Sequence, residues 1–517
     1  MFMHSTTSDK KTALLSSIYE DRTNRKLLGL AVIITLVQFI FFKLLYPFPD
    51  FFSDSYSYIY AASAHLDISI WPIGYSKFLA AFHAITHSDT ALIAFQYFFL
   101  EISAMYFFFT ILYLYQPRKI ARNLLFAFLF CNPLVLYLSN YVNSDPLFAA
   151  LSLLWITQIL WIVHRPRTYQ LFTQAVLLFA CFTVRNNAYY YPLISVLAFA
   201  VSAQSIYRKV FGMALGLALI VPFILFERNA AYKTTGTHMF SLFTGWQLAN
   251  NALYIYDQIK VDSTQLPSDA SRELDRISRE YVSTIPAKLD YRSYLQYYVG
   301  NYFIRQPQAP LKQYLYTHYT INGDSNQVQA WGKSSVVFSE YGTWIIKHYP
   351  VAYLRYFMIP NARNYFLAPL EKLDTYNLGL NDVPIVVQDW FDFKTPDIWS
   401  VSKKAQKYIL FIFPPLFLLL NLVFFCSAIA MLVKRKFKST TGFVNSTVII
   451  SALFMLANFG FSVFATINVF RYQFIPMILC LTYSLILVEV LDKKIAVPKI
   501  PLAPGKKNDF EIKMAKI

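Results

Sequence analysis

Four ionisable residues lie at the ends of apolar segments that are long enough to cross a membrane. Asp54 follows the first segment, and Asp145 precedes the fourth. Arg185 separates the fifth from the sixth, and Arg471 separates the ninth from the tenth. A carboxylate can take a proton from a hydroxyl group or hold a divalent cation, whereas an arginine matches the oxygens of a phosphate. Because hydrocarbon does not solvate charge, these four residues are candidates for a site that binds an anion and activates a hydroxyl.

The composition indicates a protein that crosses the membrane many times. Of the 517 residues, 56% are hydrophobic and only 15% are charged, whereas soluble domains have about 45–50% apolar and about 25% charged residues. The apolar segments are continuous and about 18–25 residues long, which suits helices rather than barrel strands. We therefore predict an all-α polytopic membrane protein of about ten transmembrane helices: 27–46, 91–115, 122–139, 147–163, 170–184, 188–203, 210–226, 407–432, 443–465 and 472–490.

The basic residues predict the orientation of these helices. The formal charge of the chain is +17. Its lysines and arginines gather in short loops on one side, and the loop 434–438 has the highest density of basic residues. This pattern is typical of the cytoplasmic side of a membrane protein, and it argues against nucleic-acid binding. We expect a cytoplasmic N-terminus (1–26), a basic cytoplasmic tail (491–517) and an external first loop (47–90). The four ionisable residues then all emerge on the external side.

The chain between the seventh and eighth segments is expected to fold. An N-terminal transmembrane module (27–226) and C-terminal transmembrane helices (405–490) flank an external region, 227–404, that is too long for a structureless loop. We predict a mostly helical cap over the outer face. Its residues 269–281 read as a helix capped by Ser268, and 342–357 as an interfacial helix that Pro350 kinks or restarts.

Each candidate residue also has a structural interpretation. Asp54 could cap a helix or lie as a charge at the interface, and Ser144 or Asp145 could cap the fourth span, whose first turn suits Pro146. The two arginines could anchor helix ends at the interface. The four cysteines show neither CxxC spacing nor a nearby histidine, so no metal site or disulfide framework is predicted.

Five short segments resemble a known superfamily. Asp54 with its Ser-Tyr neighbours, followed by Pro72-Ile73-Gly74-Tyr75, resembles the first external loop of GT-C-type integral membrane glycosyltransferases. Four further segments resemble later parts of that superfamily in the expected order: 143–148 (NSDPLF), 182–187 (FTVRNN), 348–354 (HYPVAYL) and 470–476 (FRYQFIP). The resemblance covers 27–225 closely and 340–490 loosely. The protein mannosyltransferases and aminoarabinose transferases are the members it is most similar to.

The resemblance implies roles for individual residues. Asp54 is implied as catalytic base or metal ligand, and Asp145 as a supporting catalytic acid. The chain departs from the superfamily in having a lone Asp54 without an Asp-x-Asp or Asp-Glu pair, which favours the base. No metal-ligating residue is assigned and no cofactor is certain, although a divalent cation stays open. The predicted substrate-binding residues are Arg185, Arg471, Tyr472, Lys77 and Tyr56.

The implied reaction is transfer of a sugar from a polyprenyl-phosphate donor, inverting at the anomeric carbon, at the external face of a bacterial inner membrane. The expected partners are that donor, membrane lipid and an acceptor glycan, lipid or protein. Two other functions stay open. A lipid-linked saccharide transporter or flippase would carry inverted repeats or broken helices at mid-membrane. An O-antigen polymerase or ligase would depend on residues of the large loop, such as His318 or Arg355, rather than on Asp54.

Overall fold

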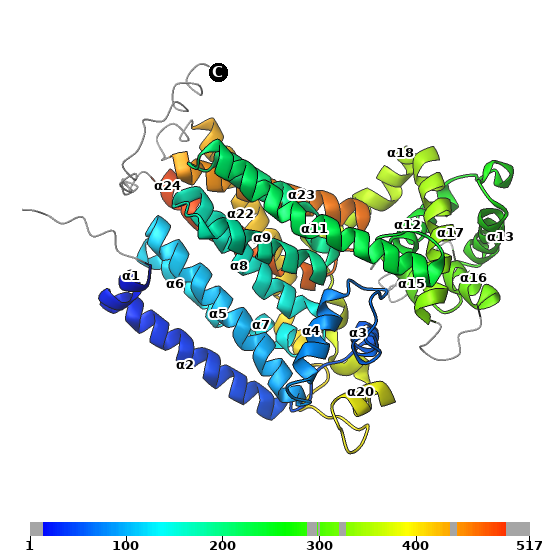
Figure 1. Ribbon diagram of the computed structural model, residues 1–517, viewed down its shortest axis with the longest axis horizontal. Helices are drawn as coiled ribbons and strands as arrows, with labels where there is room; N and C mark the ends of the chain where they lie inside the picture. The colour runs from blue at the N-terminus through cyan, green and yellow to red at the C-terminus, as the bar shows by residue number, and fades with distance from the viewer. Residues whose placement is uncertain (1–13, 287–296, 298–299, 320–326, 435–441, 493–517) are drawn as a thin grey trace, which may run out of the picture.

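The protein is a helical membrane protein with a separate helical region at one end (Figure 1). The computed structural model describes residues 14–286, 297, 300–319, 327–434 and 442–492. Apart from two isolated β-bridges, the regular structure of these residues is helical. The expectation of an all-α polytopic membrane protein is therefore confirmed at the level of fold class.

Eight helical segments in the described part of the chain are long and apolar enough to cross a membrane. They correspond to eight of the ten predicted spans, and their apolar residues explain why they fold as helices in lipid. Their bounds are α2 Arg22–Leu45, α5 Asp89–Tyr115, α6 Lys119–Phe130 with α7 Pro133–Ser139, α8 Ser144–His164, α11 Ile206–Thr235, α21 Ala405–Leu410 with α22 Phe413–Val433, α23 Gly442–Ala465, and η9 Phe470–Gln473 with α24 Phe474–Leu491.

The other two predicted spans are short helices. They are α9 (Tyr169–Val184), and α10 (Tyr191–Val201) with the preceding 3-10 turn η1 (Asn186–Tyr190). At about 1.5 Å per residue, α9 is about 24 Å long and α10 about 17 Å, less than the hydrocarbon core of about 30 Å. Arg185 lies between them and interrupts the apolar run, so this pair differs from the eight long spans.

The start of α8 differs from the sequence prediction. Its N-cap is Asn143, whose side chain accepts a hydrogen bond from the Ser144 backbone N–H, rather than Ser144 or Asp145. Asparagine is among the best capping residues, and it lies one position before the two that were predicted. Asp145 is consequently in the first turn of α8, where its carboxylate is not needed as the cap.

The helical region at one end of the bundle, here called the head, has its own hydrophobic core. Ser268 caps α13 as predicted. The predicted interfacial helix instead begins earlier, as α17, and its apolar side packs inside the head through Phe338, Tyr341 and Ile345. Pro350 starts a second helix, one of the two alternatives expected. The head helices are α12 Thr244–Leu253, α13 Asp269–Ser283, α15 Tyr302–Arg305, α16 Pro310–His318, α17 Gln327–His348 and α18 Pro350–Tyr353.

Close packing of α12 against α17 depends on two glycines. A Cβ atom at Gly245 would lie 1.8 Å from the carbonyl oxygen of Ser335, and one at Gly342 would lie 2.5 Å from the backbone nitrogen of Ala249. Backbone atoms cannot move aside as a flexible side chain can. A larger residue at either position would therefore separate the two helices.

The first loop and the segment after the head lie together at the end of α2 (Figure 1). The first loop forms α3 (Ser53–Ser63) and α4 (Gly74–His83). After the head, the turns η5 and η6 and the helices α19 and α20 lead back to the bundle, and α20 packs against α3. The bounds are η5 Leu354–Met358, α19 Ile359–Phe366, η6 Glu371–Asp374, η7 Tyr376–Gly379 and α20 Ile385–Trp390; the remaining short elements are α1 Leu14–Glu20, η2 Tyr256–Gln258 and η3 Ser263–Gln265.

Candidate functional site

Asp145 is bound by two arginines from distant parts of the chain. Its Oδ1 pairs with Nη1 of Arg185, and its Oδ2 lies 2.8 Å from Nη1 of Arg471. The three side chains are buried, with 6%, 11% and 5% exposure respectively. Asn143 also donates to Asp145 Oδ2, at 2.7 Å. A buried carboxylate with this many charge-assisted hydrogen bonds holds both guanidinium groups in fixed positions.

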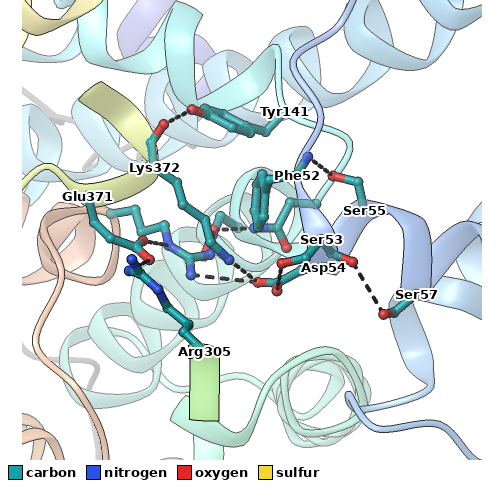
Figure 2. A network of polar contacts seen from close by, with 12 residues as sticks. Phe52, Ser53, Asp54, Ser55, Ser57, Tyr141, Arg305, Glu371 and Lys372 are labelled. Carbon is teal, nitrogen blue, oxygen red and sulfur yellow. Dashed lines mark hydrogen bonds and ion pairs between the residues drawn. The ribbon is translucent and has the colours of Figure 1, made fainter. Parts of the chain in front are cut away.

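Asp54 lies next to this group in the first turn of α3. Its Oδ2 is 3.0 Å from Nζ of Lys372 and 3.7 Å from Nη2 of Arg471, and Figure 2 shows the lysine reaching across to it. Burial raises the pKa of Asp54, but the charges of Lys372 and Arg471 outweigh burial and hold the pKa below its ordinary value. Asp54 is therefore ionised at neutral pH, and Arg471 connects it to Asp145.

Three further residues, absent from the sequence predictions, complete the cluster. Lys372 approaches Asp54, and its neighbour Glu371 lies 3.7 Å from Nε of Arg471 and 3.8 Å from Nη1 of Arg305 (Figure 2). Glu371 has φ +53°, a left-handed conformation that is costly for a residue with a side chain. The bond from Phe470 N–H to Pro369 O, 2.9 Å, holds this turn beside η9. No sequence signal separates these charges from ordinary surface charges.

The cluster has an excess of positive charge. Its three acids are Asp54, Asp145 and Glu371, and its four bases are Arg185, Arg305, Lys372 and Arg471. Buried charges are tolerated when they are paired. The six more buried groups balance, three acids against three bases, and the excess is the charge of Arg305, whose side chain is 41% exposed. This excess favours an additional anion nearby.

Aromatic rings cover the cationic groups. The guanidinium carbons of Arg185 and Arg471 each lie 4.7 Å from the centre of the Tyr472 ring. The Phe52 ring is 4.0 Å from Nζ of Lys372 and 5.4 Å from the guanidinium carbon of Arg471. These cation–π contacts partly replace the water that the cationic groups lose on burial. Tyr472, predicted as a substrate-binding residue, contacts both arginines.

A small cavity adjoins the two arginines. It is lined by Asp145, Arg185, Arg471 and Tyr472, and by residues of η1, α10, α23 and α24, among them Tyr190, Phe454 and Asn458. Phe454 also lines a second, apolar cavity between α8, α10, α23 and α24. The two cavities therefore share a lining residue, and Asp54 is not among the residues that line the first.

No family model, curated protein or solved structure matches this chain. The resemblance to the GT-C superfamily therefore rests on the five short segments alone.

Two predicted substrate-binding residues lie outside the cluster. Lys77 pairs with Asp67 at 3.2 Å, and both side chains are about half exposed or more. Tyr56 is near Asp50 and Asp382, and burial, followed by the charge of Asp50, raises its pKa to about 12. Residues two apart do not share a face of a helix, so Tyr56 points away from the side of α3 that carries Asp54. Neither residue takes part in the contacts of the cluster, and their assignment to substrate binding stays a prediction.

The carboxylates of the cluster contact arginine and lysine side chains of the protein. Asp54 and Asp145 both contact Arg471, and Glu371 lies between two arginines. Among the described residues, no group of three or more histidine, cysteine, aspartate or glutamate side chains is placed to hold a metal ion. This donor set does not fit the divalent cation that the sequence left open.

A second acid of the first loop has a positioning role. Asp50 is 2% exposed, and its Oδ1 accepts a 2.8 Å hydrogen bond from the backbone N–H of Asn377. Its backbone forms a bridge with Tyr141, whose hydroxyl donates to the carbonyl oxygen of Lys372. Burial raises the pKa of Asp50 to about 8, against the opposing effect of the Asn377 N–H. Asp50 is thus mostly protonated near neutral pH and tethers the segment that carries Lys372.

Asp50→Asn is expected to reduce the pH dependence of stability. The unfolded chain releases the Asp50 proton near pH 4 and the folded protein near pH 8, so the wild-type free energy of unfolding falls as pH rises between these values. The slope from one such group is at most about 1.4 kcal/mol per pH unit. Thermal unfolding in detergent at about pH 5 and about pH 8 measures it. Parallel pH dependences in the variant and the wild type would contradict the role of Asp50.

Proposed function

We propose that this protein is an inverting membrane glycosyltransferase that moves a sugar from a polyprenyl-phosphate donor to an acceptor hydroxyl. The observation that carries the proposal is the buried cluster itself. An ionised acid, Asp54, lies beside three cations, Arg185, Arg471 and Lys372, and the two arginines adjoin a cavity that apolar residues such as Phe454 and Ile475 also line. Such a site suits a ligand with a phosphate head and an apolar tail. We place it at the external face of a bacterial inner membrane, on the side opposite the basic loops.

The cations would bind the phosphate of the donor. Arg185 and Arg471 are oriented by Asp145 and present planar sets of N–H donors, which match phosphate oxygens. Lys372 would leave Asp54 for the phosphate. This movement of Lys372 has two effects that favour the reaction. The lysine stabilises the charge of the departing phosphate, and Asp54 loses the cation that lowers its pKa.

Asp54 would act as the general base. The acceptor oxygen attacks the anomeric carbon from the face opposite the phosphate, and its proton passes to Asp54. A new bond forms between the acceptor oxygen and the anomeric carbon. The bond between that carbon and the phosphate oxygen breaks, and its electron pair leaves with the polyprenyl phosphate. Proton and charge therefore balance without a further reactant.

The phosphate-binding role of Lys372 is tested by ligand binding. Farnesyl phosphate is expected to bind the full-length protein in detergent, whereas farnesol, which lacks the phosphate, binds much more weakly. Lys372→Met should weaken farnesyl phosphate binding by about tenfold or more, since a hydrogen bond to a charged group contributes about 1.5–3 kcal/mol. Isothermal titration calorimetry measures both ligands.

Lys77→Met is the matched control for this experiment. It also removes one lysine, but Lys77 lies at the surface in a pair with Asp67, where ion pairs contribute little. Its affinity for farnesyl phosphate should equal that of the wild type. Equal weakening by both substitutions would show that only the net charge matters, and it would contradict the proposed site.

The two other functions have less support in the contacts of the cluster. His318 pairs with Glu273 on the head, and Arg355 is exposed, so both residues expected of an O-antigen polymerase or ligase lie outside the cluster. A flippase would move fluorescent lipid-linked saccharide across reconstituted vesicles without transferring the sugar. Translocation without any transfer would favour the flippase.

A further inference from the structure

The segment between η7 and α21 forms a hairpin that exposes several large apolar residues. Asp382 and Asp397 form an antiparallel bridge, Ile398 N–H donates to Asn381 O at 2.8 Å, and Val383 N–H donates to Pro396 O at 3.0 Å. The ends of the hairpin are held together by the bond from Tyr376 N–H to Lys403 O, 2.9 Å. This gives the base of the hairpin, near 378–380 and 399–401, a defined position.

Apolar residues occupy both sides of this base. Val383, Val387 and Ile398 are buried in the core of the protein on the inner side. Around the base itself, four large apolar residues are exposed by 49–61%: Leu378, Leu380, Trp399 and Val401. A hairpin with one solvated face normally carries polar residues on that face. A group of exposed apolar residues marks an interaction surface.

This exposed apolar group is continuous with the surface that faces lipid. Val401 N–H donates to the carbonyl oxygen of Leu45 at 2.9 Å, at the end of α2. Just before that end, Phe41 and Leu44 of the membrane-spanning helix are exposed by 62% and 69%. On the other side of the hairpin the chain runs directly into α21 and α22, where Tyr408 and Phe411 are exposed by 70% and 65%. The apolar base of the hairpin therefore lies between two lipid-facing surfaces.

Charged residues lie beside this base as well as farther along the hairpin. Asp382 and Asp397 are exposed next to it, and Asp389, Asp392 and Lys394 are exposed in the part farthest from it. Tryptophan is enriched where a protein meets the membrane interface, and Trp399 is in the base. A mixture of exposed apolar and charged residues suits the interface of the membrane rather than its hydrocarbon core.

We propose that the base of the hairpin, through Leu378, Leu380, Trp399 and Val401, docks into the interface of the adjacent lipid leaflet. The occupant of this surface is lipid, because the surface joins the lipid-facing sides of α2 and α22. Glu371 and Lys372 lie in η6, a few residues before the hairpin, so lipid contact at the base of the hairpin would fix the chain that follows Lys372. The inference does not depend on the proposed transfer reaction.

Spin labelling tests the proposal in the full-length protein. Cys131 and Cys426, which are exposed, are changed to alanine, and a nitroxide is attached to Trp399→Cys in nanodiscs of phosphatidylcholine and phosphatidylglycerol. Oxygen concentrates in lipid and a charge-neutral nickel chelate in water. The ratio of oxygen to nickel collision rates should be severalfold higher at position 399 than at two controls, Lys394→Cys at the tip and Arg276→Cys on α13 of the head.

Equal ratios at position 399 and at the two controls would overturn the proposal. Spin–spin broadening at 399 that disappears on dilution with unlabelled protein would also overturn it, because a second copy of the chain would then cover the surface. Val401→Cys carries the same test if Trp399→Cys does not fold. No transfer activity is read, so failure here is separate from failure of the proposed function.

Discussion

Asp54→Asn is expected to reduce sugar transfer by about 100- to 10,000-fold, the contribution of a general base. Asparagine has nearly the same size and cannot accept the acceptor proton. Lys372 would lose its carboxylate partner but keep the Phe52 ring 4.0 Å from its Nζ, so the site should keep its shape. The measurement is transfer of radiolabelled sugar from a panel of polyprenyl-phosphate sugars to acceptors in membranes that contain the full-length protein. Binding of farnesyl phosphate should persist, because Arg185 and Arg471 stay in place.

Asp67→Asn is the matched control for this substitution. Asp67 is another acid of the first loop, but its side chain is 65% exposed and it pairs only with Lys77 in the described contacts. Transfer by this variant should equal that of the wild type. If Asp54→Asn transferred sugar at the wild-type rate with normal expression, the role of Asp54 as base would be wrong. Absence of transfer by the wild type from every donor in the panel would count against the function as a whole.

Arg471→Met is expected to destabilise the protein by about 3–5 kcal/mol, because removing one partner of a buried ion pair leaves the other charge buried without compensation. Arg471 is the partner shared by three acids: it lies 2.8 Å from Asp145 and 3.7 Å from both Asp54 and Glu371. Without Arg471, Asp145 would pair only with Arg185, and Glu371 only with Arg305. Thermal unfolding in detergent measures the loss.

Two further variants separate the stability of the site from its chemistry. Arg471→Lys keeps the charge but not the planar fork, so it should recover part of the stability while binding farnesyl phosphate more weakly than the wild type. Arg355→Met removes an exposed arginine and should change stability by about 0.5 kcal/mol or less. A small effect of Arg471→Met, similar to that of Arg355→Met, would mean that the cluster does not hold the helices together.

Several features of the fold could be predicted from local sequence. The long apolar runs gave the positions of the eight long helices, because a backbone in lipid must satisfy its hydrogen bonds within the helix. Ser268 was recognisable as a cap, and Pro350 as the start of a helix, from the residue type alone. The cap of α8 was misplaced by one residue because Asn143, Ser144 and Asp145 are all good capping residues.

The candidate site was only partly predictable. Asp54, Asp145, Arg185 and Arg471 were identified because charges at the ends of apolar spans are costly and therefore informative. Glu371, Lys372 and Arg305 carried no such signal, since a charge in a polar region normally faces water. Lys77 and Tyr56 lie outside the cluster, because closeness in sequence to Asp54 does not decide which side of a helix a residue occupies.

The sequence by itself determined the helical membrane architecture and the chemical types available at the ends of the spans, because hydrophobicity, helix length and capping are local properties. Only the tertiary structure decided which charges meet. Lys372 reaches Asp54 across 318 positions, and Arg471 reaches Asp145 across 326. These pairs form because the strained turn at Glu371 and the bridge at Asp50 bring the segment after the head back to the first loop. Folding thereby turns charges that are separate in the sequence into one cluster of paired, largely buried side chains.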